Sequence, residues 1–231
     1  MKNLKKVFEK YAIPLSKEQE AQFDKYFSML IETNKVLNLT AITEEQEVLI
    51  KHFLDSALPF AYIPQNSKVV DVGSGAGFPA LPLKIVRPDL NVCMVDSLNK
   101  RINFLSNVIS ELKLKDATAV HSRAEDFAKE NREKFDVAVA RAVASLNTLV
   151  EYLLPLIKVG GIAVIYKSSK LQEEIEVAKK AIAVLGGKIT EVANFVIEES
   201  LERNILIIKK IAKTPPKYPR DKNKPKLMPI S

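Results

Sequence analysis

Residues 71–79 read DVGSGAGFP and follow an apolar stretch that begins at Val69. Gly73, Gly75 and Gly77 occupy alternate positions of this turn, so its backbone can approach a bound molecule closely. A buried strand, a glycine-rich turn and a helix typically open a nucleotide-binding α/β domain. The segment therefore predicts an α/β fold with a ligand bound over the turn.

Short apolar segments alternate with amphipathic ones from Lys68 onward. This alternation predicts a parallel β-sheet covered by helices on both faces. Residues 188–197 and 204–211 flank the polar stretch EESLER, as in an antiparallel hairpin. We therefore expect a Rossmann-like, mostly parallel seven-stranded sheet with an antiparallel C-terminal hairpin. The expected parallel strands are residues 69–72, 91–95, 117–121, 135–140 and 162–166, with helices at 79–86, 98–112, 123–130, 144–157 and 170–185.

The first 58 residues read as helical instead. Apolar residues recur there at helical spacing, Ser16 fits an N-cap, and a further helix is expected at residues 44–58. The chain thus divides into an N-terminal helical extension over residues 1–66, a ligand-binding α/β domain over 67–212 and a basic, proline-rich tail over 213–231.

The composition favours a soluble cytoplasmic protein. Of the 231 residues 47% are hydrophobic, yet no apolar run is long enough for a membrane-spanning helix. The basic N-terminus turns polar too soon for a signal peptide. Cys93 is the only cysteine, so neither an intrachain disulfide nor a cysteine-based metal cluster can form. We expect a monomer without a metal ion.

The net charge is concentrated at the C-terminus. From Lys209 onward the chain has eight basic residues and one acidic residue, which account for the whole formal charge of +7. Five prolines in the same segment disfavour a helix or a central strand. Two interpretations stay open: a frayed, solubilising end, or an arm that contacts nucleic-acid phosphates.

The ligand over the glycine turn is expected to carry a ribose. Asp96 ends the second strand, 19 residues after Gly77. A carboxylate in this place typically accepts hydrogen bonds from ribose hydroxyls. Glycine turn and carboxylate together indicate an adenosine-containing ligand.

Three features near the turn argue against a pyrophosphate. Bulky Phe78 occupies the place of the last glycine in the dinucleotide pattern G-x-G-x-x-G. Pro79 and Pro82 remove N–H donors from the start of the next helix, and Asp71 places a negative charge near the turn. S-adenosylmethionine has a ribose and an amine but no phosphate, so we predict it as the cofactor.

Six segments are more specific than the glycines: LNLTAI (37–42), KHFLDSALPF (51–60), DVGSGAGFPALPLKIVRPDL (71–90), VDSLNKRINFL (95–105), HSRAEDF (121–127) and FDVAVARAVASL (135–146). Together they resemble the glucose-inhibited division protein B family of bacterial 16S ribosomal RNA guanine-N7 methyltransferases. The resemblance implies that activity, a class I S-adenosylmethionine-dependent methyltransferase fold, and 16S RNA or the small ribosomal subunit as partner. It has two departures: Ser168 and Ser169 replace the usual glycine after Lys167, and a tail glycine is missing near residues 221–223.

The resemblance also implies cofactor contacts in the glycine turn, at residues 96–98, and at Ala124, Glu125 and Arg141. The chemistry agrees, because a backbone N–H near Ala124 can meet an adenine ring nitrogen and Glu125 can accept from the exocyclic amine. The predicted cofactor-binding residues are Gly73, Gly75, Gly77, Phe78, Asp96, Ser97, Leu98, Ala124, Glu125 and Arg141.

No catalytic nucleophile or base is predicted. Methylation of a pyrimidine carbon needs a cysteine, but Cys93 lies in the middle of a strand and reads as a buried side chain. Methylation of an exocyclic amine usually accompanies an Asp/Asn-Pro-Pro-aromatic turn, where this chain has ARAVAS. Guanine N7 needs neither, so positioning is the main contribution, with Arg141 and Lys167 as candidates.

Two other functions stay open. A regulatory module could bind S-adenosylmethionine on the same fold without catalysis, because a fold alone does not determine function. A small-molecule methyltransferase is disfavoured by the basic tail and by the lack of an evident substrate lid beyond the N-terminal helices.

Overall fold

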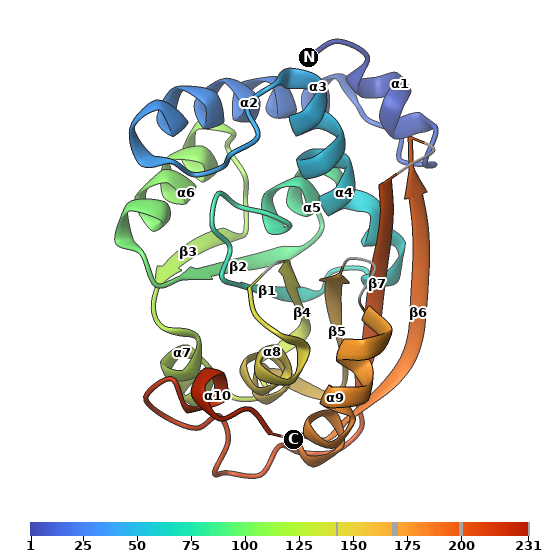
Figure 1. The fold of residues 1–231 in the computed structure, drawn as a ribbon. Helices are drawn as coiled ribbons and strands as arrows, with labels where there is room; N and C mark the ends of the chain where they lie inside the picture. The colour runs from blue at the N-terminus through green and yellow to red at the C-terminus, as the bar shows by residue number, and fades with distance from the viewer. Residues whose placement is uncertain (142, 168–170, 199–200, 231) are drawn as a thin grey trace.

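The computed structural model describes residues 1–141, 143–167, 171–198 and 201–230. A seven-stranded sheet with the order β3-β2-β1-β4-β5-β7-β6 lies between two layers of helices (Figure 1). Strands β1 to β5 pair in parallel, and β7 is antiparallel to both β5 and β6. The expected fold is confirmed. The strands are β1 (Lys68–Val72), β2 (Asn91–Asp96), β3 (Ala117–His121), β4 (Phe135–Arg141), β5 (Ile157–Lys167), β6 (Gly187–Ile197) and β7 (Leu201–Lys210).

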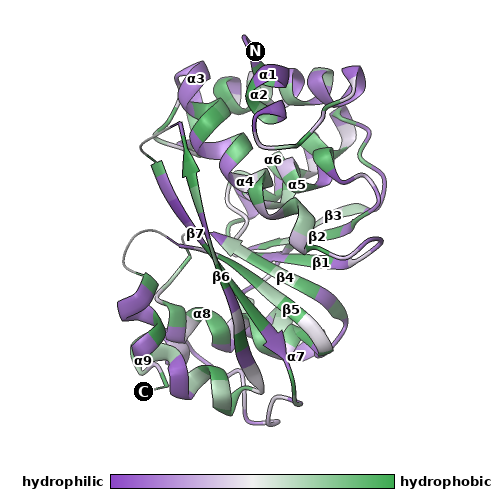
Figure 2. Cartoon of the chain, turned by 90° about the vertical axis from the view of Figure 1, so that its right-hand side faces the viewer, coloured by the Kyte–Doolittle hydropathy of each residue, from purple (hydrophilic) through white to green (hydrophobic). Residues whose placement is uncertain are grey.

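The two layers of helices bury opposite faces of the sheet (Figure 2). In β4, Val137 and Val139 pack in one hydrophobic cluster, whereas Ala138 and Ala140 pack in the other. Burial on both faces explains the continuous apolar sequence of these strands. One layer contains α1 (Leu4–Glu9), α2 (Lys17–Leu37), α3 (Glu45–Val48), α4 (Asp55–Ala57), α5 (Ala80–Val86) and α6 (Asn99–Glu111); the other contains α7 (Ala124–Glu130), α8 (Leu146–Leu153), α9 (Leu171–Val184) and the short α10 (Lys224–Leu227). None of the helices in the described ranges is long and apolar enough to cross a bilayer.

The N-terminal helices hold the glycine turn from one side. Ser16 and Gln19 form a capping box at the start of α2. On the same helix, the buried Tyr26 hydroxyl donates to the carbonyl of Ala76 in the turn, at 2.6 Å. The predicted helical extension therefore packs directly against the predicted ligand-binding turn.

Two predicted helices differ in detail from the observed ones. The helix expected at 44–58 is composite, because a π-helix (Leu49–Leu54) separates α3 from α4 and a 3₁₀ helix (Leu58–Tyr62) follows. The helix expected at 144–157 ends at Leu153 and continues as a short 3₁₀ segment. Pro155 lies in that segment, and a proline ring supplies no N–H to continue an α-helix.

The C-terminal segment packs against α7 and α8. Tyr218 is buried, and Arg132 donates to its carbonyl and, at 2.7 Å, to that of Thr214. Arg220 forms a two-pronged ion pair with the fully buried Glu151. The interpretation as a frayed end is therefore wrong. The prolines also permit one helical turn, α10, because Pro225 lies in its first turn, where an N–H has no helical acceptor.

Candidate functional site

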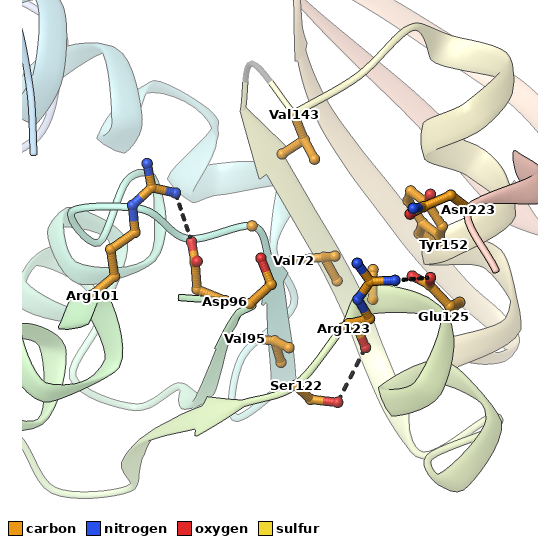
Figure 3. A pocket seen from close by; sticks show the side chains of 13 residues that line it. Val72, Val95, Asp96, Arg101, Ser122, Arg123, Glu125, Val143, Tyr152 and Asn223 are labelled. Atoms are coloured by element: carbon orange, nitrogen blue, oxygen red, sulfur yellow. Dashed lines mark hydrogen bonds and ion pairs between the residues drawn. The ribbon is translucent and has the colours of Figure 1, made fainter. Parts of the chain in front are cut away.

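A cavity of about 310 Å³ opens beyond the carboxyl ends of β1, β2 and β3 (Figure 3). This edge of a parallel sheet is where ligands bind in open α/β folds. The cavity brings together Gly73, Asp96, Ser97, Ala124 and Glu125 of the predicted site. Its other lining residues are Val72, Val95, Arg101, Ser122, Arg123, Val143, Tyr152 and Asn223.

The three glycines of the turn have different surroundings, although all have positive φ angles of 77°, 59° and 101°. Gly73 lines the cavity, and a Cβ atom there would lie 2.9 Å from Val143 Cγ2. At Gly77 a Cβ atom would lie 2.3 Å from Leu81 Cδ1 and 2.9 Å from the Tyr26 hydroxyl. Gly77 therefore allows close packing beneath the turn, and only Gly73 of the three faces the cavity.

Asp96 ties the glycine turn to the end of β2. Its Oδ2 accepts from Gly75 N at 2.9 Å and from Arg101 Nη1 at 3.2 Å, and its Oδ1 accepts from Leu98 N at 2.9 Å. A carboxylate has about four acceptor sites, so one is left for a ligand hydroxyl. The half-exposed Arg101 can withdraw and release a second. The carboxylate thus fits the two hydroxyls of a ribose.

The opposite end of the cavity lies at the start of α7. Glu125 is buried, its carboxylate is 3.7 Å from Arg123 Nη1, and its Oε1 completes no hydrogen bond within the described residues. Asn223, from the C-terminal segment, lies beside Tyr152 and Glu125 (Figure 3). Asn223 has a left-handed φ of 57°, a conformation that asparagine adopts more readily than most residues other than glycine. Asn223 can therefore take the place of the glycine that the family resemblance led us to expect near residues 221–223.

Asp71 lies buried beneath the turn without lining the cavity. Neither of its carboxylate oxygens completes a hydrogen bond within the part of the chain that the structure describes. Burial raises the pKa of Asp71 to about 8, against smaller opposing effects of Ser74, the Ala80 backbone and Arg141. With this pKa the group is largely protonated at neutral pH, and a cation close to the turn would favour its ionised form, whereas an anion would keep it protonated.

Arg141 and Lys167 line a second cavity, of about 450 Å³, at the carboxyl ends of β4 and β5. Arg141 Nη1 donates to Asp55 Oδ2 at 2.8 Å and to the carbonyl of Lys51 at 3.0 Å. Arg203 Nε donates to the other Asp55 oxygen at 2.9 Å. The buried Asp55 thereby holds both guanidinium groups in place.

Phe78 does not line the first cavity. Its ring stacks on His52 with a centroid distance of 4.4 Å, and the Arg141 guanidinium lies 4.9 Å from its centre. Leu98 likewise lies outside the lining, with its backbone N–H bonded to Asp96. The structure therefore brings five of the ten predicted cofactor-binding residues into the first cavity and Arg141 into the second. Ser168 and Ser169 lie outside the described residues.

Residues 19–206 match the GidB family, rRNA small subunit methyltransferase G. A protein named ribosomal RNA small subunit methyltransferase G from Lachnoclostridium phytofermentans is 50% identical over 221 residues, which cover 94% of this chain and 91% of the relative. One from Staphylococcus aureus strain JH9 is 50% identical over 222 residues, 94% of this chain and 93% of the relative. The chain belongs to this family.

Solved structures outside the rRNA small subunit methyltransferase G family share the fold. M. jannaschii TYW2 in complex with AdoMet superposes with a TM-score of 0.56 at 15% identity, over 74% of this chain and 80% of that one. Precorrin-6y C5,15-methyltransferase from Geobacter metallireducens gives a TM-score of 0.53 at 13% identity, over 73% and 90%. At these identities the likeness establishes the architecture alone.

Several residues that line the two cavities could not be predicted from the sequence. Tyr152 and Asn223 reach the first cavity from α8 and the C-terminal segment, far along the chain from the glycine turn. Glu174 and Arg203 reach the second cavity from α9 and β7. Arg101 is the exception, because it lies within the VDSLNKRINFL segment that carries the family resemblance.

His52 is expected to make the stability of the protein depend on pH. His52 Nδ1 lies 3.2 Å from Arg141 Nη2 and 3.1 Å from the carbonyl oxygen of Lys51, and Nε2 lies 2.8 Å from Thr40 Oγ1. Burial, with the Arg141 charge, lowers the pKa of His52 from 6.5 to about 4. As the pH falls, His52 binds a proton in the unfolded chain before it does in the folded one. The contribution of the neutral His52 to stability is therefore fully present above pH 6.5 and is lost as the pH falls towards 4. One pKa unit is about 1.36 kcal/mol, which makes the loss roughly 2–3 kcal/mol.

Chemical denaturation of the wild type and of His52→Gln between pH 4 and 8 measures this effect. The difference between the two unfolding free energies should change by that amount across the range. His121→Gln, at the other histidine of the chain, is the matched control. Parallel curves for wild type and His52→Gln would contradict the assignment of a neutral His52.

Proposed function

We propose that this chain transfers a methyl group from S-adenosylmethionine to N7 of a guanosine in bacterial 16S ribosomal RNA. The observation that carries the proposal is a cavity that joins Gly73, Asp96 and Glu125 at the carboxyl edge of the sheet. It occurs in a member of the rRNA small subunit methyltransferase G family. A second, cation-lined cavity beside the first favours an enzyme with two substrates over a non-catalytic binding module.

The residues present fit S-adenosylmethionine. Asp96 would accept from the ribose hydroxyls, Glu125 and the backbone of Ala124 would bind the adenine edge, and Gly73 leaves room for the methionine part. The buried Asp71 carboxyl group beneath the turn completes no hydrogen bond within the described residues, and it would ionise beside an ammonium group but not beside a phosphate. When bound, S-adenosylmethionine supplies an electrophilic methyl group on a sulfonium.

Methylation of guanine N7 requires little acid–base chemistry from the protein. The lone pair of guanine N7 forms the new N–C bond while the electron pair of the broken S–C bond stays on sulfur. The positive charge passes from sulfur to the guanine ring, and no proton has to leave. Cys93 lies within β2 and burial raises the pKa of its thiol, which suits a packing role and not a nucleophile. The chain's contribution is to position the two reactants.

Incubation with methyl-labelled S-adenosylmethionine and unmodified 16S RNA tests the proposal directly. Naked RNA, an assembly intermediate and the small ribosomal subunit should be compared as substrates. We expect label on a single guanine and recovery of 7-methylguanosine after digestion. Label on another base or atom, or none on any of the three forms, would refute the proposed function.

The exposed lysines of the C-terminal segment are proposed to contact RNA phosphates. Of the eight basic residues from Lys209 onward, Arg220 and the buried Lys210 bond to protein partners. Lys209 is partly buried in β7, which leaves five exposed side chains. Replacing these five by glutamine should flatten the salt dependence of RNA binding. The slope of log affinity against log salt should fall by roughly 0.7–0.9 for each lysine that contacts a phosphate. The residues are Lys213, Lys217, Lys222, Lys224 and Lys226.

Glutamine replacement is a sharper test than deletion of the tail, because the tail also contributes Asn223 to the first cavity. Arg220 stays in place, so the segment remains docked. RNA affinity is measured at several salt concentrations for both proteins, with cofactor affinity as the control that should not change. Superimposable slopes would show that these lysines make no phosphate contact.

A further inference from the structure

The two cavities have lining residues only two positions apart in the chain, at the end of β4 and just after it. Val143 lines the first cavity against Gly73, and Arg141 lines the second. Two residues of chain span at most about 7 Å. The walls of the two cavities therefore approach each other at this point, which suits a base in the second cavity and a methyl donor in the first.

The charged groups of the second cavity are not equally available to a ligand. Arg141 and Arg203 are held by Asp55. The low pKa of His52 leaves that side chain neutral. A further ion pair joins Lys167 to Glu174, with a distance of 2.6 Å from Nζ to Oε2. Lys51 also lines the cavity and pairs with Glu47. Lys167 and Glu174 therefore place a cation and an anion side by side in the wall of the cavity.

Lys167 and Glu174 keep one donor and one acceptor side by side. Lys167 Nζ donates to the carbonyl of Ala144 at 3.0 Å and to Glu174, so among the described residues one of its three N–H groups has no acceptor. Glu174 Oε2 also accepts from Leu146 N at 2.9 Å, whereas Oε1 accepts from no group within the described ranges. The two bonds to Oε2 fix the carboxylate and leave Oε1 free for a ligand.

This donor–acceptor pair matches the Watson–Crick edge of guanine, which has an acceptor at O6 beside donors at N1 and the 2-amino group. Adenine reverses the pattern, with a donor at its 6-amino group and an acceptor at N1. Enzymes that act on a base commonly read this edge once the base has left the stack. Such reading leaves N7 uncovered, as the reaction requires.

We propose that the second cavity binds the target guanine, with Glu174 Oε1 accepting from N1–H and the 2-amino group and Lys167 Nζ donating to O6. Glu174 and Lys167 are thus specificity-determining residues. The inference rests on the proposed function and extends it to the recognition of the base.

An RNA with inosine at the target position separates the two contacts, because inosine keeps O6 and N1–H but lacks the 2-amino group. Single-turnover methylation is compared on guanosine and inosine RNA for the wild type and two variants. The wild type should prefer guanosine at least 10-fold, since a site built to bond a polar group rejects a substrate that lacks it. Glu174→Gln should lower the rate on guanosine RNA about 10–100-fold and bring the ratio near one. Lys167→Gln should slow both RNAs alike and keep the ratio.

The matched control is Glu176→Gln on the same helix, where Glu176 is exposed and paired with Lys179. It should behave as wild type. Melting temperature and S-adenosylmethionine affinity are measured for every variant. The affinity should stay within twofold of wild type, which shows that the fold and the cofactor site are intact. A wild-type guanosine preference retained in Glu174→Gln would overturn this inference alone. A wild type that methylates no guanosine RNA would overturn the proposed function and this inference with it.

Discussion

Replacing Asp96 with alanine is expected to weaken the binding of S-adenosylmethionine at least 100-fold. Two hydrogen bonds from ribose hydroxyls to a carboxylate are together worth about 3 kcal/mol or more, which is roughly 100-fold in dissociation constant. The structure adds a second reason. The same carboxylate accepts from the N–H groups of Gly75 and Leu98, so its loss also loosens the turn that shapes the cavity.

Calorimetric titration with S-adenosylmethionine and with its demethylated product, S-adenosylhomocysteine, measures the effect. Asp96→Asn keeps an acceptor but not the charge, and should fall between wild type and Asp96→Ala. Asp126→Ala, an exposed carboxylate at the start of α7, is the matched control and should bind as wild type. An Asp96→Ala protein that binds within threefold of wild type would show that Asp96 does not hold the ribose.

The strands of the sheet are predictable because each is a short apolar run between turns. Two strands begin several residues earlier than expected: β7 begins at Leu201 and not at residue 204, and β5 begins at Ile157 and not at residue 162. At the start of β5, Lys158, Val159 and Gly160 are exposed, so they show neither the alternation nor the apolar run of a buried strand. They lie in the register shift between the pairs Phe135–Ile157 and Val137–Ile162 of β4 and β5, which the local sequence does not encode.

The residues of the candidate site likewise fall into two groups, those that the local sequence predicts and those that depend on tertiary contacts. Gly73 and Asp96 are predictable because each directly follows or ends a strand, and parallel strands end at one edge of the sheet. Asn223 reaches that edge only because the C-terminal segment docks on α8. Composition alone suggests the opposite for this segment, since prolines and lysines are typical of solvated ends. What overrides composition is a specific partner, Glu151, whose charge is buried in α8.

Arg220→Ala is therefore expected to destabilise the protein strongly. Glu151 is fully buried, and Arg220 donates to it from Nε at 2.9 Å and from Nη2 at 2.7 Å. Removing the guanidinium leaves a buried carboxylate with the Arg220 backbone N–H as its remaining partner from that residue. Breaking a buried ion pair in this way costs about 3 kcal/mol, or roughly 6–12 °C in melting temperature for a chain of this size.

The cost should come from the unpaired charge and not from lost packing, and a double variant tests this. Glu151→Leu combined with Arg220→Ala removes both charges, so it should be more stable than Arg220→Ala alone. Lys222→Ala, two residues further along the exposed surface, should melt as wild type. Because Asn223 lines the first cavity three residues after Arg220, Arg220→Ala should also bind S-adenosylmethionine more weakly than Lys222→Ala does. An Arg220→Ala protein with wild-type melting and cofactor affinity would mean that the docked C-terminal segment supports neither the fold nor the cavity.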